Sequence, residues 1–208
     1  MRRKFENSRT ERKLARISGV RLVKETFLII CEGENTEPDY FKAFRLTSAT
    51  IKAVGQGLGT TALVKKAIKI KEQEKIKGHT FNRAWVVFDK DDFSDNDFNA
   101  AIILAQQNQF EVAYSNQAFE YWFLLHFNLY QIPINRSRYE EMLSNLLGFS
   151  YSKKTGVSNK MFNALLGKQQ QAIANAKIVM KQFNGSNPAQ EESSTTVYRL
   201  VENLNKFL

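Results

Sequence analysis

The sequence is poor in the residues that build disulfide-linked and zinc-stabilised proteins, with one cysteine and two histidines among 208 residues. The single cysteine, Cys31, excludes an intrachain disulfide framework. With only His79 and His126 beside it, the chain also lacks the ligands of a Cys/His zinc site. We therefore expect any bound metal ion to be held by oxygen atoms.

Long apolar runs are lacking as well. No stretch approaches the length of a membrane span, and the opening residues, MRRKFEN, lack the apolar segment of a secretory signal. From this we expect a cytoplasmic protein with no membrane partner. The 3 prolines, 43% hydrophobic residues and 25% charged residues are typical of a folded globular protein, and 208 residues suffice for one α/β domain.

Negative charge is the scarcer sign. The chain has 30 Lys and Arg residues against 21 Asp and Glu residues, which gives a formal net charge of +9. Such a field attracts polyanions, including nucleic acid, nucleotides and anionic membrane surfaces. Part of the excess lies in residues 1–24, which we interpret as a basic N-terminal arm. This arm is either a tether for nucleic acid or a solvated terminus.

Short apolar runs alternate with amphipathic stretches over residues 25–116. The apolar runs predict four strands, at residues 27–31, 49–54, 84–88 and 111–114. The amphipathic stretches predict helices between them, at residues 36–46, 62–77 and 96–108. Strands that alternate with helices at this spacing imply right-handed crossovers. We therefore predict an α/β core with a mainly parallel four-stranded sheet covered by helices on both faces.

After residue 116 the pattern becomes helical. Helices are predicted at residues 119–127, 137–147, 159–183 and 196–207, with a loop rich in Gly, Pro and Ser at residues 184–194. We interpret residues 117–208 as a helical extension that packs on the core. The dense aromatic residues of its first helix are expected to be buried core rather than a surface for stacking bases.

Acidic residues follow two of the predicted strands. Glu32 comes directly after the first strand, and Asp89 comes directly after the third, with Asp91 two residues on. Ligands of open parallel sheets bind beyond the carboxyl ends of the strands, and alternate residues of an extended strand end share one face. Glu32, Asp89 and Asp91 therefore predict a site for Mg²⁺ or Mn²⁺ with positions open to a phosphodiester. The alternative is that these acids cap helices or solvate loops.

The residues around these acids resemble two known groups of proteins. Residues 27–33 (FLIICEG) and 86–91 (VVFDKD) resemble the Toprim arrangement of topoisomerases, primases and related nucleases. Residues 32–41 (EGENTEPDYF), 89–92 (DKDD) and 115–127 (SNQAFEYWFLLHF) are similar to the RloB-like proteins. One departure is Asn116-Gln117, where a Ser-x-Pro or Asn-Pro type of turn is expected. It removes no acid.

The resemblance implies a fold, a reaction and a setting. It implies a Toprim-like, Rossmann-like sheet in which Glu32 acts as general acid, general base or metal ligand and Asp89 and Asp91 bind magnesium. The implied activity is metal-dependent cleavage of DNA or RNA. The implied setting is a bacterial or archaeal restriction-associated or anti-phage (abortive infection) system that works with an ATPase partner.

Two other functions stay open. One is a noncatalytic module that binds nucleic acid or docks on a partner, with structural acids. The other is a different phosphoryl-transfer enzyme, such as a nucleotidyltransferase, although the chain has no obvious triphosphate-binding motif.

Further acids are candidates for the same site. Glu120 lies in an apolar setting where an unpaired charge is costly. It either reaches the metal site as another ligand and acts in catalysis, or makes a structural hydrogen bond or salt bridge within the helical layer. Asp92, Glu34 and Glu37 also flank the site. Because acids near a helix N-terminus also complement the helix dipole, we expect at most one of Glu34 and Glu37 to be functional.

Basic residues and glycines suggest nucleic-acid contacts. The backbone N–H groups of Gly57 and Gly59 precede the second helix and could meet a phosphate, with Lys65 and Lys66 of that helix near its backbone. A simple turn into the helix is the alternative. A further patch could form from four lysines that otherwise mark a solvated face, namely Lys153, Lys154, Lys160 and Lys168. We expect His126 to be a buried structural residue rather than a catalyst.

Overall fold

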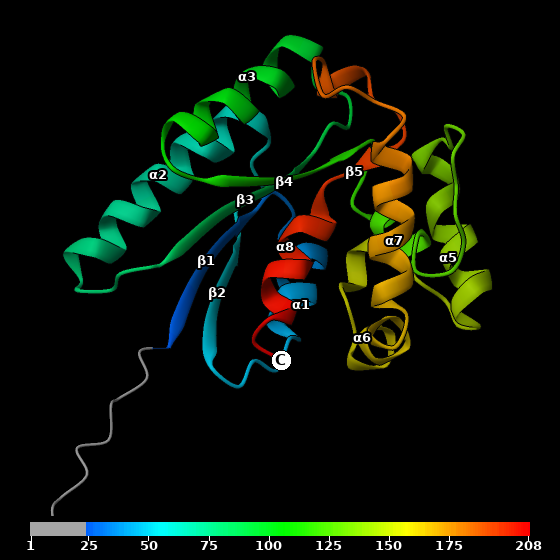
Figure 1. Cartoon of the computed structure of the whole chain (residues 1–208), viewed down its shortest axis with the longest axis horizontal. Coiled ribbons are helices and arrows are strands. Elements are labelled where there is room, and N and C mark those ends of the chain that lie inside the picture. The colour runs from blue at the N-terminus through cyan, green and yellow to red at the C-terminus, as the bar shows by residue number, and fades with distance from the viewer. Residues whose placement is uncertain (1–23) are drawn as a thin grey trace, which may run out of the picture.

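The computed structural model describes residues 24–208, except for the side chain of residue 155. The predicted basic arm over residues 1–24 therefore lies outside the described residues, apart from Lys24. The rest forms a five-stranded sheet in the order β2-β1-β3-β4-β5, with helices on both faces (Figure 1). Within the described part, no helix is long and apolar enough to cross a membrane.

Four parallel strands form most of the sheet, as predicted. They are β1 (Glu25–Cys31), β2 (Ala49–Gly55), β3 (Arg83–Asp89) and β4 (Glu111–Asn116). The strand β1 reads as a continuous apolar run because both of its faces are covered. Phe27 and Ile29 pack into one core, whereas Leu28 and Ile30 pack into the core on the opposite face.

A fifth strand corrects the predicted four-stranded sheet. β5 (Ser194–Thr195) pairs antiparallel with β4, with Thr195 opposite Ser115. The sequence places this strand at the end of a predicted loop because its residues are polar and too few to show a period. Side-chain hydrogen bonds hold it: Thr195 Oγ1 lies 3.1 Å from Ser115 Oγ, and both side chains are fully buried.

Two helices cover one face of the sheet. They are α2 (Thr60–Ile76) and α3 (Asp95–Gln107), which lie on the left and at the top of Figure 1. α3 begins where Ser94 caps it, because the Ser94 side chain accepts a hydrogen bond from the Asp97 backbone N–H at 3.1 Å. The bounds of both helices agree with the prediction to within two residues at each end.

The opposite face carries the remaining helices. They are α1 (Thr36–Lys42), α4 (Glu120–Leu124), α5 (Tyr139–Leu147), α6 (Asn159–Leu166), α7 (Gln169–Met180) and α8 (Val197–Asn205). Three single turns of 3₁₀ helix join them, namely η1 (Arg136–Arg138), η2 (Lys153–Thr155) and η3 (Pro188–Gln190). The long helix predicted at residues 159–183 is wrong, because the chain turns at Gly167 and Lys168 and forms α6 and α7 instead.

One core joins the sheet to this helical layer. It includes Phe27 and Trp85 of the strands together with Tyr40, Phe119 and Trp122. The indole N–H of Trp122 donates to the Tyr40 hydroxyl at 3.1 Å, which satisfies a polar group inside this core. The aromatic residues of the 119–127 segment are thus core residues, as predicted.

Candidate active site at the carboxyl end of the sheet

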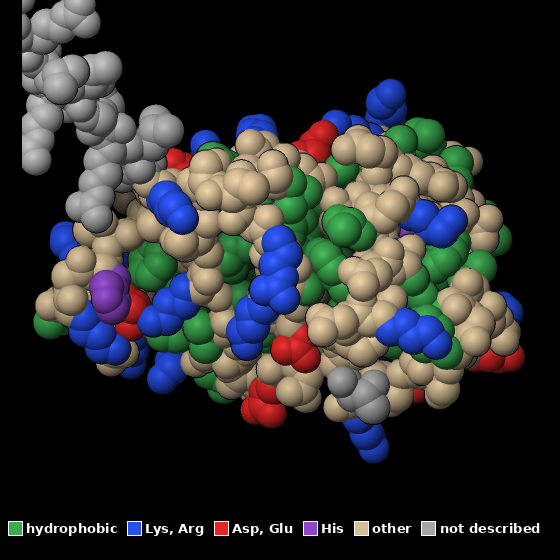
Figure 2. Space-filling model, turned by 90° about the horizontal axis from the view of Figure 1, so that it is seen from below, with side chains coloured by type: hydrophobic (Ala, Val, Ile, Leu, Met, Phe, Trp, Pro, Cys, Tyr) green, Lys and Arg blue, Asp and Glu red, His purple; other side chains and the backbone are tan. Residues whose placement is uncertain are grey.

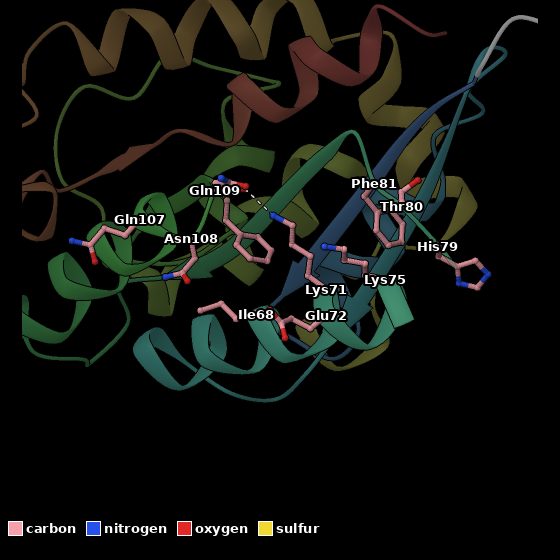
Figure 3. Close-up of a pocket in the computed structure, with 11 residues that line it drawn as sticks. Ile68, Lys71, Glu72, Lys75, His79, Thr80, Phe81, Gln107, Asn108 and Gln109 are labelled. Atoms are coloured by element: carbon pink, nitrogen blue, oxygen red, sulfur yellow. Dashed lines mark hydrogen bonds between the residues drawn. The ribbon is translucent and has the colours of Figure 1, made fainter. Parts of the chain in front are cut away.

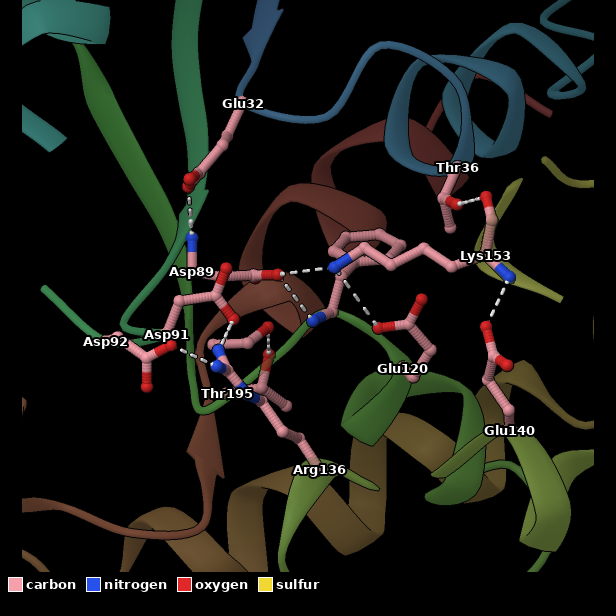
Figure 4. Close-up of polar contacts among 12 residues, drawn as sticks. Glu32, Thr36, Asp89, Asp91, Asp92, Glu120, Arg136, Glu140, Lys153 and Thr195 are labelled. Carbon is pink, nitrogen blue, oxygen red and sulfur yellow. Dashed lines mark hydrogen bonds and ion pairs between the residues drawn. The ribbon is translucent and has the colours of Figure 1, made fainter. Parts of the chain in front are cut away.

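Glu32 and Asp89 lie side by side at the carboxyl end of the sheet. The strands that carry them are neighbours, because β1 pairs parallel with β3 and Cys31 is opposite Val87. The carboxylate of Glu32 accepts a hydrogen bond from the Asp89 backbone N–H at 2.9 Å (Figure 4). This contact orients the Glu32 side chain across the end of β3.

Asp89 and Glu120 are buried carboxylates on facing elements, each only 2% exposed. Asp89 Oδ2 accepts a hydrogen bond from the Phe119 backbone N–H at 2.9 Å. Glu120 Oε1 accepts one from the Tyr151 hydroxyl at 2.8 Å. Each carboxylate therefore has one oxygen held in place, and the start of α4 is tied directly to the end of β3.

Lys153 supplies positive charge to both carboxylates. Its Nζ lies 3.8 Å from Asp89 Oδ2 and 3.9 Å from Glu120 Oε2. Burial alone would lower the pKa of Lys153, but the nearby acids, Glu120 first and then Asp89, Asp91 and Glu37, together raise the pKa above its ordinary value. The backbone N–H of Lys153 donates to Glu140 at 2.8 Å, which holds η2 over the site. Lys153 thus lies among the acidic residues at this end of the sheet, which include Glu32, Asp89 and Glu120 and are called the acidic cluster below. It does not belong to the separate surface patch of lysines that the sequence suggested.

Asp91 lies in a turn, and not on an extended strand end. β3 ends at Asp89, and Asp91 has a φ of 40°, in the left-handed region. The expectation that Asp89 and Asp91 share one face of an extended strand is therefore wrong. Asp91 and Asp92 instead form ion pairs with the guanidinium of Arg136, which projects from η1 (Figure 4).

Glu37 joins the cluster, whereas Glu34 faces solvent. Glu37 is 1% exposed and its Oε2 has no hydrogen-bond partner among residues 24–208. Burial raises the pKa of Glu37, the charge of Glu120 raises it further, and Lys153 opposes this. Glu34 is exposed and lies beside Gly57 in the loop after β2.

Burial and mutual repulsion favour protonation of these acids. Burial, with the charges of Asp91 and Glu37, raises the pKa of Glu32 to about 7, although the Asp89 N–H works against this. The pKa of Asp89 is also raised well above its ordinary value, by burial first and then by Glu37. The carboxylates are therefore short of positive charge even with Lys153 present.

The donor type of this cluster, carboxylate oxygen, suits a hard divalent cation, but its present arrangement does not. Carboxylates are the ligands that Mg²⁺ prefers, and Glu32, Asp89 and Asp91 supply them. Asp89 Oδ1 and Glu37 Oε2 are buried without a hydrogen-bond partner among the described residues, which a cation would relieve. However, no three Asp, Glu, His or Cys residues of the described part are grouped to hold a metal ion as they stand. Asp91, engaged by Arg136, would have to turn toward the other two.

The glycine loop before α2 has a structural role. The backbone N–H of Gly57 donates to the backbone carbonyl of Glu32 at 2.9 Å. It is therefore not free to bind a phosphate, and the prediction of a phosphate contact at Gly57 is wrong. Gly59 lies against the site, because a Cβ there would come within 2.9 Å of Glu32 Oε1 and 2.0 Å of the Phe93 ring. Lys65 and Lys66 are exposed on α2.

The remaining predicted residues lie outside the cluster. His126 is fully buried, its Nδ1 lies 3.0 Å from the Trp122 carbonyl, and burial lowers its pKa to about 4. It is a structural residue, as expected. Lys154 is exposed, whereas Lys160 and Lys168 lie over the rings of Phe149 and Phe127 at 4.2 and 5.5 Å.

Sequence reasoning missed Arg136 and the site role of Lys153. Both lie in short irregular segments with no periodic pattern and no motif. The only available signal was general, since buried or clustered acids need basic partners. It does not say which of 30 basic residues supplies them.

Comparison with known proteins supports the resemblance seen in the motifs. The family model described as RloB-like protein matches residues 27–204. Searches of curated proteins and of solved structures gave no match. The family match spans β1 to α8 and includes every acid of the cluster. The chain belongs to the RloB-like family.

Proposed function

We propose that this protein is a divalent-metal-dependent nuclease of Toprim type that cleaves DNA or RNA phosphodiesters. We propose further that it acts with an ATPase in a bacterial or archaeal anti-phage or restriction-associated system, a setting that rests on the resemblance alone. One observation carries the catalytic part. The Glu32 carboxylate is hydrogen-bonded at 2.9 Å to the backbone of Asp89, at the ends of two adjacent parallel strands.

Each residue of the cluster has a role in this reaction. Glu32, Asp89 and Asp91 would hold Mg²⁺ or Mn²⁺, which when bound supplies positive charge to the phosphodiester. Alternatively, Glu32 does not bind the cation and instead accepts a proton from the attacking water or returns one to the leaving oxygen. Glu120 positions the Lys153 ammonium, which can contact a phosphate oxygen.

The charge of the whole protein suits a polyanionic substrate. The net charge is +9, and Lys and Arg side chains are more frequent than acidic ones on the face seen in Figure 2. A basic surface attracts nucleic acid without regard to sequence. The acids of the cluster form a local exception, which is expected where a cation binds between protein and phosphate.

A cleavage assay tests the proposal. Labelled single- and double-stranded DNA and RNA are incubated with Mg²⁺, Mn²⁺ or EDTA and with wild type, Asp89→Asn or Glu32→Gln. Glu34→Gln is the matched control, because Glu34 lies on the same loop but is exposed. We expect metal-dependent cleavage that both site substitutions abolish and the control retains.

Two other outcomes decide against this function. If cleavage is absent even with a partner ATPase, while wild type and variants bind nucleic acid equally, the acids are structural and the protein is a binding module. If nucleoside triphosphates are consumed and nucleic acid is extended, the enzyme is a nucleotidyltransferase.

A further inference from the structure

A second concave site lies at the opposite edge of the sheet. It is a cavity of about 420 Å³ between the carboxyl-terminal half of α2, the segment that precedes β3 and the segment that follows α3 (Figure 3). The cavity lies at the amino end of β3 and the acidic cluster at its carboxyl end. The two sites are therefore separated by the length of this strand of 7 residues, which is roughly 20 Å. The volume lies within the range of roughly 300–1,000 Å³ that is usual for small-molecule sites.

The wall formed by α2 is basic. Lys71 and Lys75 are one helical turn apart and both line the cavity, with their amino groups directed into it (Figure 3). Among residues 24–208, neither lysine forms an ion pair with an acidic residue. Lys71 makes only a 3.4 Å contact with the Gln109 carbonyl and lies 4.8 Å from the Phe110 ring centre.

Nearby acids do not neutralise this wall. Glu74 is already shared by Lys52, Lys77 and His79, at 2.6, 3.0 and 2.9 Å. Glu72 is the one acidic side chain among the described residues that line the cavity, and it is exposed. The cavity is therefore lined by two ammonium groups that form no ion pair with a carboxylate of the described residues.

The opposite wall is aromatic and polar. Phe81 is partly buried, packs against the core and lines the cavity from the segment before β3. Gln107 and Gln109 add amide groups, which can both donate and accept hydrogen bonds. A planar heterocycle on Phe81 would leave an attached phosphate near Lys71 and Lys75.

We propose that this cavity binds a nucleotide unit, with the base on Phe81 and the phosphate on Lys71 and Lys75. Such a unit can be a free nucleotide or one residue of a nucleic-acid strand, since the recognised chemistry is the same. The site is separate from the acidic cluster, and its occupation does not require the proposed nuclease activity.

Calorimetric titration in EDTA tests this site while excluding metal-dependent cleavage. The probes are adenosine monophosphate, adenosine, inorganic phosphate and a short single-stranded oligoadenylate. We expect the monophosphate or the oligonucleotide to bind at least about tenfold more tightly than adenosine or phosphate, because only they combine stacking with charge pairing. Preference for the monophosphate identifies a free nucleotide, and preference for the oligonucleotide identifies a strand.

Variants locate the binding. The double substitution Lys71→Ala and Lys75→Ala should lower the affinity for the preferred probe by about tenfold or more. Lys69→Ala with Lys206→Ala is the matched control, because it removes equal charge from exposed positions that do not line the cavity. Phe81→Leu should lower the affinity for the preferred probe but leave the affinity for inorganic phosphate unchanged. The proposal is overturned if wild type binds neither nucleotide probe or if both lysine pairs weaken binding equally.

Discussion

At the scale of single residues, burial and pairing decide which acids can act. Glu32, Asp89 and Glu37 are withdrawn from water, so their pKa values rise, whereas Asp91 keeps a guanidinium partner. Arg136 pairs with Oδ1 of Asp91, one of the three carboxylates that would hold a cation at the strand ends. The guanidinium and a metal ion are therefore expected to compete for Asp91.

Removing Arg136 should strengthen metal binding. In Arg136→Ala the carboxylates of Asp91 and Asp92 lose their partner and become free ligands, so we expect the affinity for Mn²⁺ to rise by about tenfold. Titration followed by electron paramagnetic resonance measures this without any substrate. Arg138→Ala is the control, because Arg138 is exposed on the same 3₁₀ turn. Equal or weaker Mn²⁺ binding by Arg136→Ala would contradict the competition.

His126 should make stability depend on pH between about pH 4 and 6.5. Burial lowers its pKa to about 4, so below pH 6.5 the unfolded chain binds a proton that the folded chain does not. This contribution to stability is present above pH 6.5 and is lost as the pH falls toward 4, by up to about 1.4 kcal/mol per pH unit.

Urea unfolding at several pH values measures this contribution. His126→Gln should remove it, whereas His79→Gln should not, because the side chain of His79 is 64% exposed. If both variants retain the pH dependence of wild type, His126 is not its source. Glu32 and Asp89 contribute to the pH dependence of stability with the opposite sign, because their raised pKa values favour the folded state as the pH falls. The contribution of His126 is therefore the difference in unfolding free energy between wild type and His126→Gln at each pH.

At the scale of elements, the two glycines that follow α5 and α6 differ in backbone conformation. Gly148 ends α5 in the left-handed region, with a φ of 72°, whereas Gly167 follows α6 with a right-handed φ of −67°. A Cβ at either position would meet nothing within 4 Å. The two sites therefore differ in backbone conformation and not in available space.

Alanine at these glycines should have opposite effects. Gly167→Ala should stabilise the fold by about 0.5–1 kcal/mol, because it restricts the unfolded chain at a conformation that alanine adopts freely. Gly148→Ala should destabilise it by about 1 kcal/mol, because alanine is strained at positive φ. Urea unfolding compares the two, and the same sign for both would refute this explanation.

At the scale of the whole molecule, the site is assembled from segments far apart in the chain. Glu32, Asp89 and Asp91 follow or end β1 and β3, whereas Glu37 lies in α1 and Glu120 in α4. The basic partners of these acids come from η1 and η2 of the helical layer. The family match over residues 27–204 covers both parts. The helical extension is thus part of the candidate site as well as a cover for the sheet.

The net charge of +9 predicts strongly salt-dependent binding of nucleic acid. Counterions are released when basic groups meet phosphates, so raising salt from about 50 to 200 mM should weaken binding by roughly tenfold or more. Fluorescence anisotropy with a labelled oligonucleotide in EDTA measures this. An affinity that does not change with salt would argue against a basic nucleic-acid surface.

The local pattern of the sequence determined much of this protein. Continuous apolar runs and helical spacing predicted the four parallel strands, because period and burial act on neighbouring residues. The position of Glu32 and Asp89 directly after two such strands placed them at one edge, because the carboxyl ends of parallel strands share an edge. The RloB-like motifs surround these same residues.

Only the tertiary structure decided the rest. Arg136 reaches Asp91 over 45 residues of sequence and Ser115 meets Thr195 over 80, and neither contact has a local signature. The sequence also does not show that Glu37 joins the acidic cluster while Glu34 faces solvent. That difference depends on which of the two side chains the helical layer covers. Such contacts form between surfaces that exist only after the chain has folded, so no periodic pattern in the sequence records them.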